Sequence, residues 1–155
     1  ASRRPTLAWL GDLTLLHDLD GLEAAGNAGW PLTLVVVNNR GGGIFHQLPI
    51  AHHRGVFERL FATPRSARLA PLCEALGAHH QQVALAAGAF PEALRNAQQR
   101  PGLKLLEISV DRHHSVRRRR AALHACEQAL HDWLSRRRQT PAAATDAALN
   151  REAAS

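Results

Sequence analysis

Residues 31–43 read Pro-Leu-Thr-Leu-Val-Val-Val-Asn-Asn-Arg-Gly-Gly-Gly, and this stretch decides the fold. Up to Val37 it is apolar and rich in β-branched side chains, as expected for the central strand of a parallel sheet covered on both faces. Asn38 and Asn39 close the run, and three glycines follow behind Arg40. The stretch therefore predicts a buried strand that ends in amide side chains and a glycine-rich turn.

An earlier strand pattern ends in a comparable way. Residues 6–10 form a short apolar run, and Gly11-Asp12 follows it directly. Gly11 permits a tight turn with close backbone approach, and Asp12 supplies an anionic oxygen. Leu13 and Thr14 then open a helix whose unpaired N–H groups suit a phosphate.

Together the two strand ends offer oxygen ligands for a hard cation such as Mg²⁺. Asp12 contributes a carboxylate and Asn39 a neutral amide oxygen, and a carbonyl of the turn at 40–42 can complete the protein's share of an octahedral shell. A divalent ion held in this way usually bridges to phosphate oxygens. Each motif alone is also compatible with ordinary turn chemistry, but the pair, each member after an apolar strand, favours a diphosphate-cofactor site.

The remaining pattern alternates helices and strands. Helices are expected over 15–25, 67–76, 91–99 and 115–138, a short amphipathic piece over 56–61, a loop over 38–54, and further strands over 79–84 and 104–110. This order predicts an α/β domain over residues 1–139 with a doubly wound, mostly parallel sheet. In such sheets ligands bind at the carboxyl ends of the strands. The Ala-rich residues 140–155 predict a poorly ordered tail.

Composition narrows the class of protein. A chain of 155 residues is long enough to bury one core, and no apolar run approaches the roughly 20 residues that span a bilayer. The absence of Met and the opening Ala1-Ser2 suggest a segment cut from a longer polypeptide. Cys73 and Cys126 lie in helical patterns among apolar neighbours, which indicates buried thiols in a reducing cytoplasm.

The net charge of +6 comes largely from two arginine runs, 117–120 and 136–138. We interpret them as a solvated helix face and a basic helix end. Nucleic-acid binding is the alternative, but no aromatic side chains interleave with the arginines as a base-stacking platform requires. The histidine pairs 52–53, 79–80 and 113–114 lack the spacing of a metal site, so we expect them on surfaces or in loops.

Gly11-Asp12 and Asn38-Asn39 at this spacing resemble the diphosphate-binding motif of thiamin-diphosphate enzymes. The third position of that motif is usually glycine, and this chain has Leu13. The stretches 11–22 and 36–45, together with Leu48-Pro49, resemble one branch in particular. This branch is the MenD-type synthases of menaquinone biosynthesis, which make 2-succinyl-5-enolpyruvyl-6-hydroxy-3-cyclohexene-1-carboxylate, and Leu at the third position fits it.

The resemblance implies a C-terminal, diphosphate-binding (PP-type) domain that binds thiamin diphosphate and Mg²⁺, with Mn²⁺ as an alternative ion. It implies that the metal is bound by Asp12, the side chain of Asn39 and the carbonyl of Gly41. The implied cofactor-binding residues are Gly11, Asp12, Leu13, Thr14, Asn39, Gly41 and Ile44. Ile44, Phe45 and Leu48 match positions that line the active site, although core packing explains them equally well from sequence alone. None of these residues is assigned a certain catalytic role.

The resemblance also implies a reaction and its partners. In the family, 2-oxoglutarate is decarboxylated on the cofactor, and the succinyl unit is added to isochorismate, a transferase reaction. The activating glutamate belongs to an N-terminal pyrimidine-binding domain, usually from another subunit of a homodimer or homotetramer. The segment alone should therefore be inert. A non-catalytic α/β binding or assembly module, without nucleic-acid or membrane partners, is the alternative.

Overall fold

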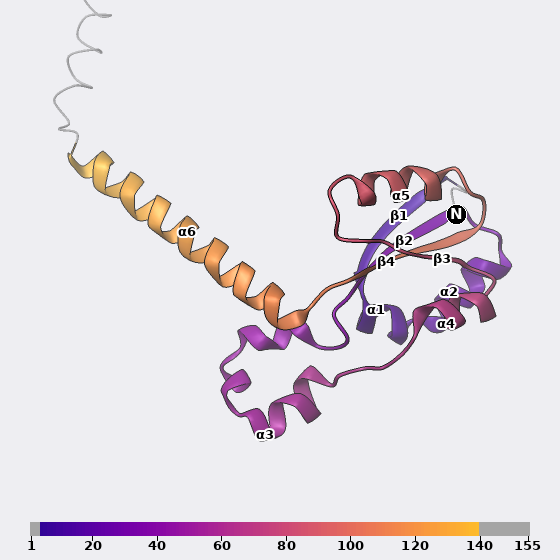
Figure 1. Ribbon diagram of the computed structural model, residues 1–155, viewed down its shortest axis with the longest axis horizontal. Helices are drawn as coiled ribbons and strands as arrows, with labels where there is room; N and C mark the ends of the chain where they lie inside the picture. Colours follow the sequence, from indigo (N-terminus) through magenta and orange to yellow (C-terminus); the bar gives the residue numbers. More distant parts are fainter. Residues whose placement is uncertain (1–3, 140–155) are drawn as a thin grey trace, which may run out of the picture. The chain divides into compact units, whose positions relative to one another are not determined.

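The computed structural model describes residues 4–139 (Figure 1). The chain divides into two compact units, Ala1–Val116 and Arg117–Ser155, and the first unit contains the sheet. The predicted tail at 140–155 lies outside the described residues, and the extent of the domain, 1–139, stays a prediction. Within the described range, none of the helices combines the length and hydropathy needed to cross a bilayer.

Four parallel strands form the sheet in the order β1-β2-β4-β3. The strands are β1 (Thr6–Gly11), β2 (Leu32–Asn38), β3 (His79–Gln82) and β4 (Leu103–Ser109). β2 and β4 are central and pair along their whole length, from Leu32 opposite Leu103 to Asn38 opposite Ser109. The apolar run at 31–37 therefore is the central strand that the sequence predicts.

Helices and short helical turns connect these strands. They are α1 (Asp12–His17), α2 (Leu19–Asn27), the 3₁₀ turns η1 (Gly43–Gln47) and η2 (Pro49–His52), α3 (Arg54–Phe57), the π-helical turn η3 (Glu58–Ala62), α4 (Leu69–Ala75), α5 (Ala89–Gln98) and α6 (Arg112–Gln139). The helix expected over 15–25 is two helices, because the backbone of Asp18 leaves the helical region at φ −128° and ψ 50°. The segment expected to be a loop over 38–54 contains the two 3₁₀ turns.

The two faces of the sheet are covered by different helices (Figure 1). Side chains of α1, α2 and α4 pack on one face, against Leu34 and Val36 of β2. Val35, the residue between them, points to the other face and packs under α5. Because successive strand residues alternate between the faces, this pattern confirms the prediction of a doubly wound parallel sheet.

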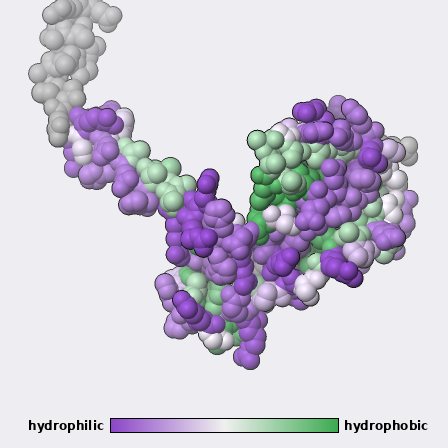
Figure 2. Space-filling view, viewed as in Figure 1, coloured by the Kyte–Doolittle hydropathy of each residue, from purple (hydrophilic) through white to green (hydrophobic). Residues whose placement is uncertain are grey.

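One prediction about buried side chains needs correction. Cys73 is buried as expected, but Cys126 in α6 is exposed, because that helix is polar and exposed around most of its circumference. Both tryptophans of the first unit are accessible, with Trp9 61% exposed and Trp30 44% exposed. Figure 2 shows further apolar surface on the segment between β3 and α5, where Leu85 is 74% exposed.

Candidate metal and diphosphate centre

The pairing of β1 and β2 brings the two sequence motifs to one edge of the sheet. Gly11 lies opposite Val37, so both strands end at the same level. Asp12 follows directly and is 4% exposed, and its Oδ2 accepts a hydrogen bond of 2.7 Å from the backbone N–H of Gly41. The carboxylate of one motif thus contacts the turn that follows the other.

The turn after β2 has a backbone that depends on glycine. Arg40 is left-handed at φ 59°, and Gly41 has φ 131°. A Cβ atom on Gly41 would lie 2.4 Å from the carbonyl oxygen of Ala62. The N–H of Gly42 donates to the same carbonyl at 2.7 Å. The glycine run therefore permits a close approach of two backbone segments that other residues would prevent.

Asn39 carries the observation that points to a cation. Its Oδ1 atom is buried and has no hydrogen-bond partner among the residues that the structure describes. A buried acceptor left unpaired costs about 1–3 kcal/mol, and a metal ion would remove this cost. Beside a buried carboxylate and the Gly41 turn, the amide oxygen fits the oxygen-only ligand set of Mg²⁺ or Mn²⁺. Among the described residues no group of three His, Cys, Asp or Glu could hold a metal.

The first turn of α1 lies at the same edge. Gly11 is the N-cap residue, with extended φ −89° and ψ 164°, and the helix begins at Asp12. Leu13 and Thr14 therefore lie in the first turn, where backbone N–H groups lack partners within the helix. The sequence predicts that Leu13 and Thr14 lie at this helix start. Their contact with a diphosphate stays a prediction.

The three apolar residues of the motif lie in or just after η1. Ile44 is 68% exposed and Leu48 is 48% exposed, so core packing does not explain either side chain. Phe45 is half-buried and packs edge-on against Phe61, with 6.0 Å between the ring centroids. The structure therefore leaves Ile44 and Leu48 accessible to a ligand or another polypeptide.

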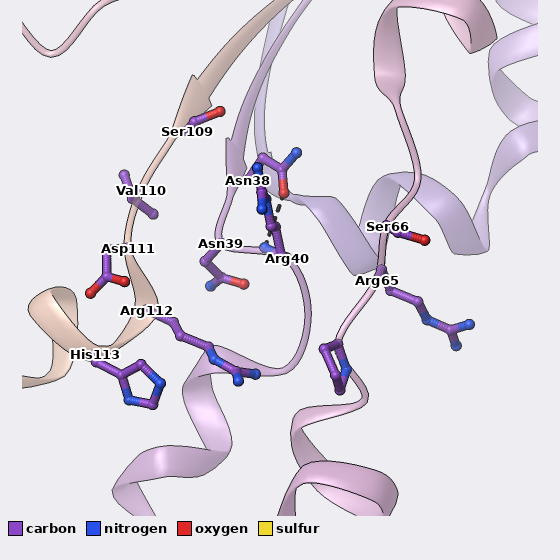
Figure 3. Close-up of a pocket in the computed structure, with 11 residues that line it drawn as sticks. Asn38, Asn39, Arg40, Arg65, Ser66, Ser109, Val110, Asp111, Arg112 and His113 are labelled. Atoms are coloured by element: carbon purple, nitrogen blue, oxygen red, sulfur yellow. Dashed lines mark hydrogen bonds between the residues drawn. The ribbon is translucent and has the colours of Figure 1, made fainter.

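A basic cavity of about 680 Å³ opens at the carboxyl ends of β2 and β4. Figure 3 shows Asn38 joined to the backbone of Arg40 at the end of β2, with Arg65 and Arg112 on the surrounding segments. Arg112 is held by an ion pair of 2.7 Å with Glu58. The cavity adjoins the candidate metal site through Asn39, which also lines the cavity.

A buried polar cluster under this edge was not predicted. Glu107 of β4 is 8% exposed; its Oε1 accepts a bond of 2.6 Å from Asn38 Nδ2, and its Oε2 lies 2.8 Å from His80 Nε2. The expectation that His80 lies on a surface or in a loop is wrong, because this side chain is in β3 and only 15% exposed. The sequence signal was a single acidic residue inside the apolar β4 run.

The same face carries the buried thiol of Cys73. Burial, and to a smaller extent the negative charge of Glu107, raises the pKa of Cys73 to about 11. At neutral pH the side chain is therefore a protonated thiol that packs as a small apolar group.

Comparisons with known proteins place the chain in a family. The sequence profile described as "Thiamine pyrophosphate enzyme, C-terminal TPP binding domain" matches residues 1–108. The 2-succinyl-5-enolpyruvyl-6-hydroxy-3-cyclohexene-1-carboxylate synthase of Synechococcus sp. (strain JA-3-3Ab) is 41% identical over 118 residues, covering 75% of this chain and 19% of the relative. The same synthase of Saccharopolyspora erythraea is 45% identical over 111 residues, covering 70% and 19%. The chain thus spans about a fifth of the length of these relatives.

Solved structures show the same fold at low sequence identity. Benzoylformate decarboxylase from Polynucleobacter necessarius superposes with a TM-score of 0.59 at 16% identity, covering 71% of this chain and 20% of that one. The thiamine diphosphate-dependent 4-hydroxybenzoylformate decarboxylase of Rhodococcus jostii RHA1 gives a TM-score of 0.59 at 19% identity, covering 70% and 20%. With the profile match over most of its length, the chain belongs to the family of thiamine pyrophosphate enzyme C-terminal TPP-binding domains.

Proposed function

We propose that this chain is the diphosphate- and metal-binding part of a thiamin-diphosphate-dependent carboligase of menaquinone biosynthesis. The whole enzyme decarboxylates 2-oxoglutarate and adds the succinyl unit to isochorismate. The identity of 41–45% to synthases of this name supports the reaction. The buried, unpartnered Oδ1 of Asn39 beside Asp12 is the observation that carries the metal site.

In this proposal, Asp12, Asn39 and the carbonyl of Gly41 hold Mg²⁺ or Mn²⁺. The metal would hold the diphosphate, and the backbone of Gly11 and the first turn of α1, with Leu13 and Thr14, would contact it. Thiamin diphosphate supplies the electron sink for decarboxylation. The protein contributes orientation, because the two strand ends fix the diphosphate and thereby the position of the reactive ring.

Ile44, Phe45 and Leu48 line the active site beside that ring. Two of them are large apolar side chains left exposed on this chain, and apolar walls exclude water from a site where charge develops. The opposite wall belongs to the pyrimidine-binding domain, which supplies the activating glutamate from another subunit of a homodimer or homotetramer. The proposed assembly acts in the cytoplasm. The sequence similarity to synthases favours this function over the alternative of a non-catalytic binding or assembly module.

Calorimetric titration with thiamin diphosphate in the presence of Mg²⁺ tests the metal site. We expect the wild-type chain to bind, Asp12→Ala to lose binding, and Asp20→Ala to bind like the wild type, because Asp20 is an exposed carboxylate of α2. Equal binding by the wild type and Asp12→Ala would contradict the assignment.

The isolated chain should not decarboxylate 2-oxoglutarate, even with thiamin diphosphate and Mg²⁺ present. The reason is that the group that activates the aminopyrimidine lies on the other domain. Release of CO₂ can be followed in a coupled assay, and turnover above that of Asp12→Ala would show that the chain is a complete catalyst.

A further inference from the structure

We propose that Asn38 and Glu107 are positioning residues that hold the turn at 40–41 in the conformation required for metal binding. The inference rests on the proposed function, since it concerns the ligands Asp12, Asn39 and Gly41. Its evidence is a continuous set of hydrogen bonds that runs from β3 across β4 to the carboxyl end of β2.

Asn38 uses both ends of its buried amide. Nδ2 donates to Glu107 Oε1 at 2.6 Å, and Oδ1 accepts the backbone N–H of Arg40 at 3.0 Å. The backbone carbonyl of Asn38 also accepts the N–H of Val110 at 2.9 Å. The side chain therefore links β4 directly to the first residue of the turn.

Glu107 fixes the orientation of the side-chain amide of Asn38. An ionised carboxylate only accepts hydrogen bonds, so the NH₂ group of Asn38 must point toward it and the oxygen toward Arg40. His80 occupies the second carboxylate oxygen at 2.8 Å. With both of its oxygens engaged, Glu107 presents a fixed acceptor to Asn38.

The oriented amide oxygen stabilises a backbone conformation that is otherwise unfavourable. Arg40 is left-handed at φ 59°, which costs a non-glycine residue roughly 1–2 kcal/mol. Two bonds offset this cost, one from the Arg40 N–H to Asn38 and one from the Arg65 N–H to the Arg40 carbonyl at 3.1 Å. The next N–H, that of Gly41, then meets Asp12.

Packing alone does not explain Glu107. The side chain lies on the apolar face of the sheet, in line with Leu103 and Leu105 of the same strand. Burying a carboxylate there costs free energy that a leucine would not cost. The hydrogen bonds to Asn38 and His80 offset the cost of burying the carboxylate. Of the two partners, only Asn38 is in turn bonded to the turn at the metal site.

The test compares a single variant, which removes the hydrogen-bond donor at residue 38, with a double variant, which exchanges donor and acceptor between residues 38 and 107. Asn38→Asp places two carboxylates in contact and removes the donor, so we expect the affinity for Mn²⁺ with thiamin diphosphate to fall by about 10- to 100-fold, the usual effect of losing a partner that orients a ligand. In the double variant Asn38→Asp with Glu107→Gln, the glutamine amide donates to the new carboxylate, and most of the affinity should return. Electron paramagnetic resonance of free Mn²⁺, titrated against the full chain, measures both.

Two further variants separate positioning from folding. Glu107→Leu should keep a cooperative thermal transition yet bind Mn²⁺ as weakly as Asn38→Asp. Ser109→Ala removes the exposed bond of 3.0 Å between Gln82 and Ser109, which joins β3 and β4 as the His80–Glu107 contact does, and this variant should bind like the wild type. Wild-type Mn²⁺ affinity in folded Glu107→Leu, or no recovery in the double variant, would overturn the inference.

Asp12→Ala distinguishes this inference from the proposed function. If Asp12→Ala binds Mn²⁺ like the wild type, the metal site itself is wrong and the inference fails with it. If Asp12→Ala loses the ion while Asn38→Asp and Glu107→Leu retain it, the metal site stands and only the positioning role is wrong.

Discussion

At the scale of single residues, Gly41 occupies a strongly constrained position. Its φ of 131° and the 2.4 Å between a would-be Cβ and the Ala62 carbonyl oppose any side chain. We expect Gly41→Ala to lower the free energy of unfolding by roughly 2–3 kcal/mol. Gly55→Ala in α3 is the matched control, because no atom lies within 4 Å of a Cβ there, and it should be stabilising by about 0.5 kcal/mol. Urea unfolding followed by circular dichroism compares them, and equal effects would contradict the strain at Gly41.

The two cysteines should differ in reactivity. Cys126 is exposed, whereas Cys73 is buried with its pKa raised to about 11. At pH 8 a thiol reagent such as iodoacetamide should label Cys126 within minutes and Cys73 only after unfolding, because the thiolate is the nucleophile. Mass spectrometry of peptides from the labelled chain identifies the site, and rapid native labelling of Cys73 would contradict its burial.

The same shift in pKa makes the fold sensitive to alkali. Cys73 binds its proton more tightly in the folded chain than in the unfolded chain, whose thiol has the ordinary pKa of 9.0. Its contribution to stability is therefore complete below pH 9 and is lost as the pH rises from about 9 toward 11. Cys73→Ala should flatten the fall in free energy of unfolding across this window, and Cys126→Ala should leave it unchanged.

At the scale of elements, β4 carries a buried lysine on the face covered by α5. Lys104 is 1% exposed, and its Nζ donates to the carbonyl of Arg100 at 2.9 Å. Desolvation by burial lowers the pKa of Lys104, so its charge opposes folding at neutral pH. We expect Lys104→Met to raise the free energy of unfolding by about 1 kcal/mol.

This gain has a definite pH dependence. For a lysine with a lowered folded pKa, stability rises as the pH increases from that pKa toward the ordinary value of 10.5. The advantage of Lys104→Met should therefore be full below this window and shrink within it. Chemical denaturation of both proteins at pH 7 and pH 10 measures the difference. An advantage that grows with pH would contradict the buried charge.

The elements themselves were largely predictable. β1, β2 and β4 carry apolar runs that a parallel sheet requires, and their predicted bounds agree with the structure to within two residues. The break at Asp18 was missed because the apolar spacing continues through it, although Asp18 is the N-cap residue of α2 and aspartate is a residue type favoured at that position. The 3₁₀ turns after β2 begin directly behind a contact between Gly42 and Ala62, which the local sequence pattern does not reveal.

At the scale of the whole molecule, the strand order decides which site residues were predictable. Asp12 and Asn39 follow consecutive, paired strands, so their meeting could be predicted from sequence. Glu107 meets Asn38 on one side and His80 on the other only because the order is β1-β2-β4-β3. That order depends on the packing of helices on both faces, and a single sequence does not reveal it.

The arginines of α6 provide the last prediction. Within its own unit this part of α6 is exposed, and we interpret its charge as solvation rather than a nucleic-acid site. Replacing residues 117–120 with glutamine should leave cofactor binding unchanged. A salt-dependent DNA mobility shift present in the wild type and lost in this variant would instead favour nucleic-acid binding.

The bond between Asp12 and the Gly41 N–H has an evolutionary consequence. Because the carboxylate holds the turn even without a ligand, replacing it harms folding as well as metal affinity. A descendant that abandoned the chemistry would still be selected to keep the aspartate. Retention of this residue in a diverged copy is therefore poor evidence of retained catalysis, whereas Asn39, whose buried oxygen has no structural partner, would be free to drift and is the better marker.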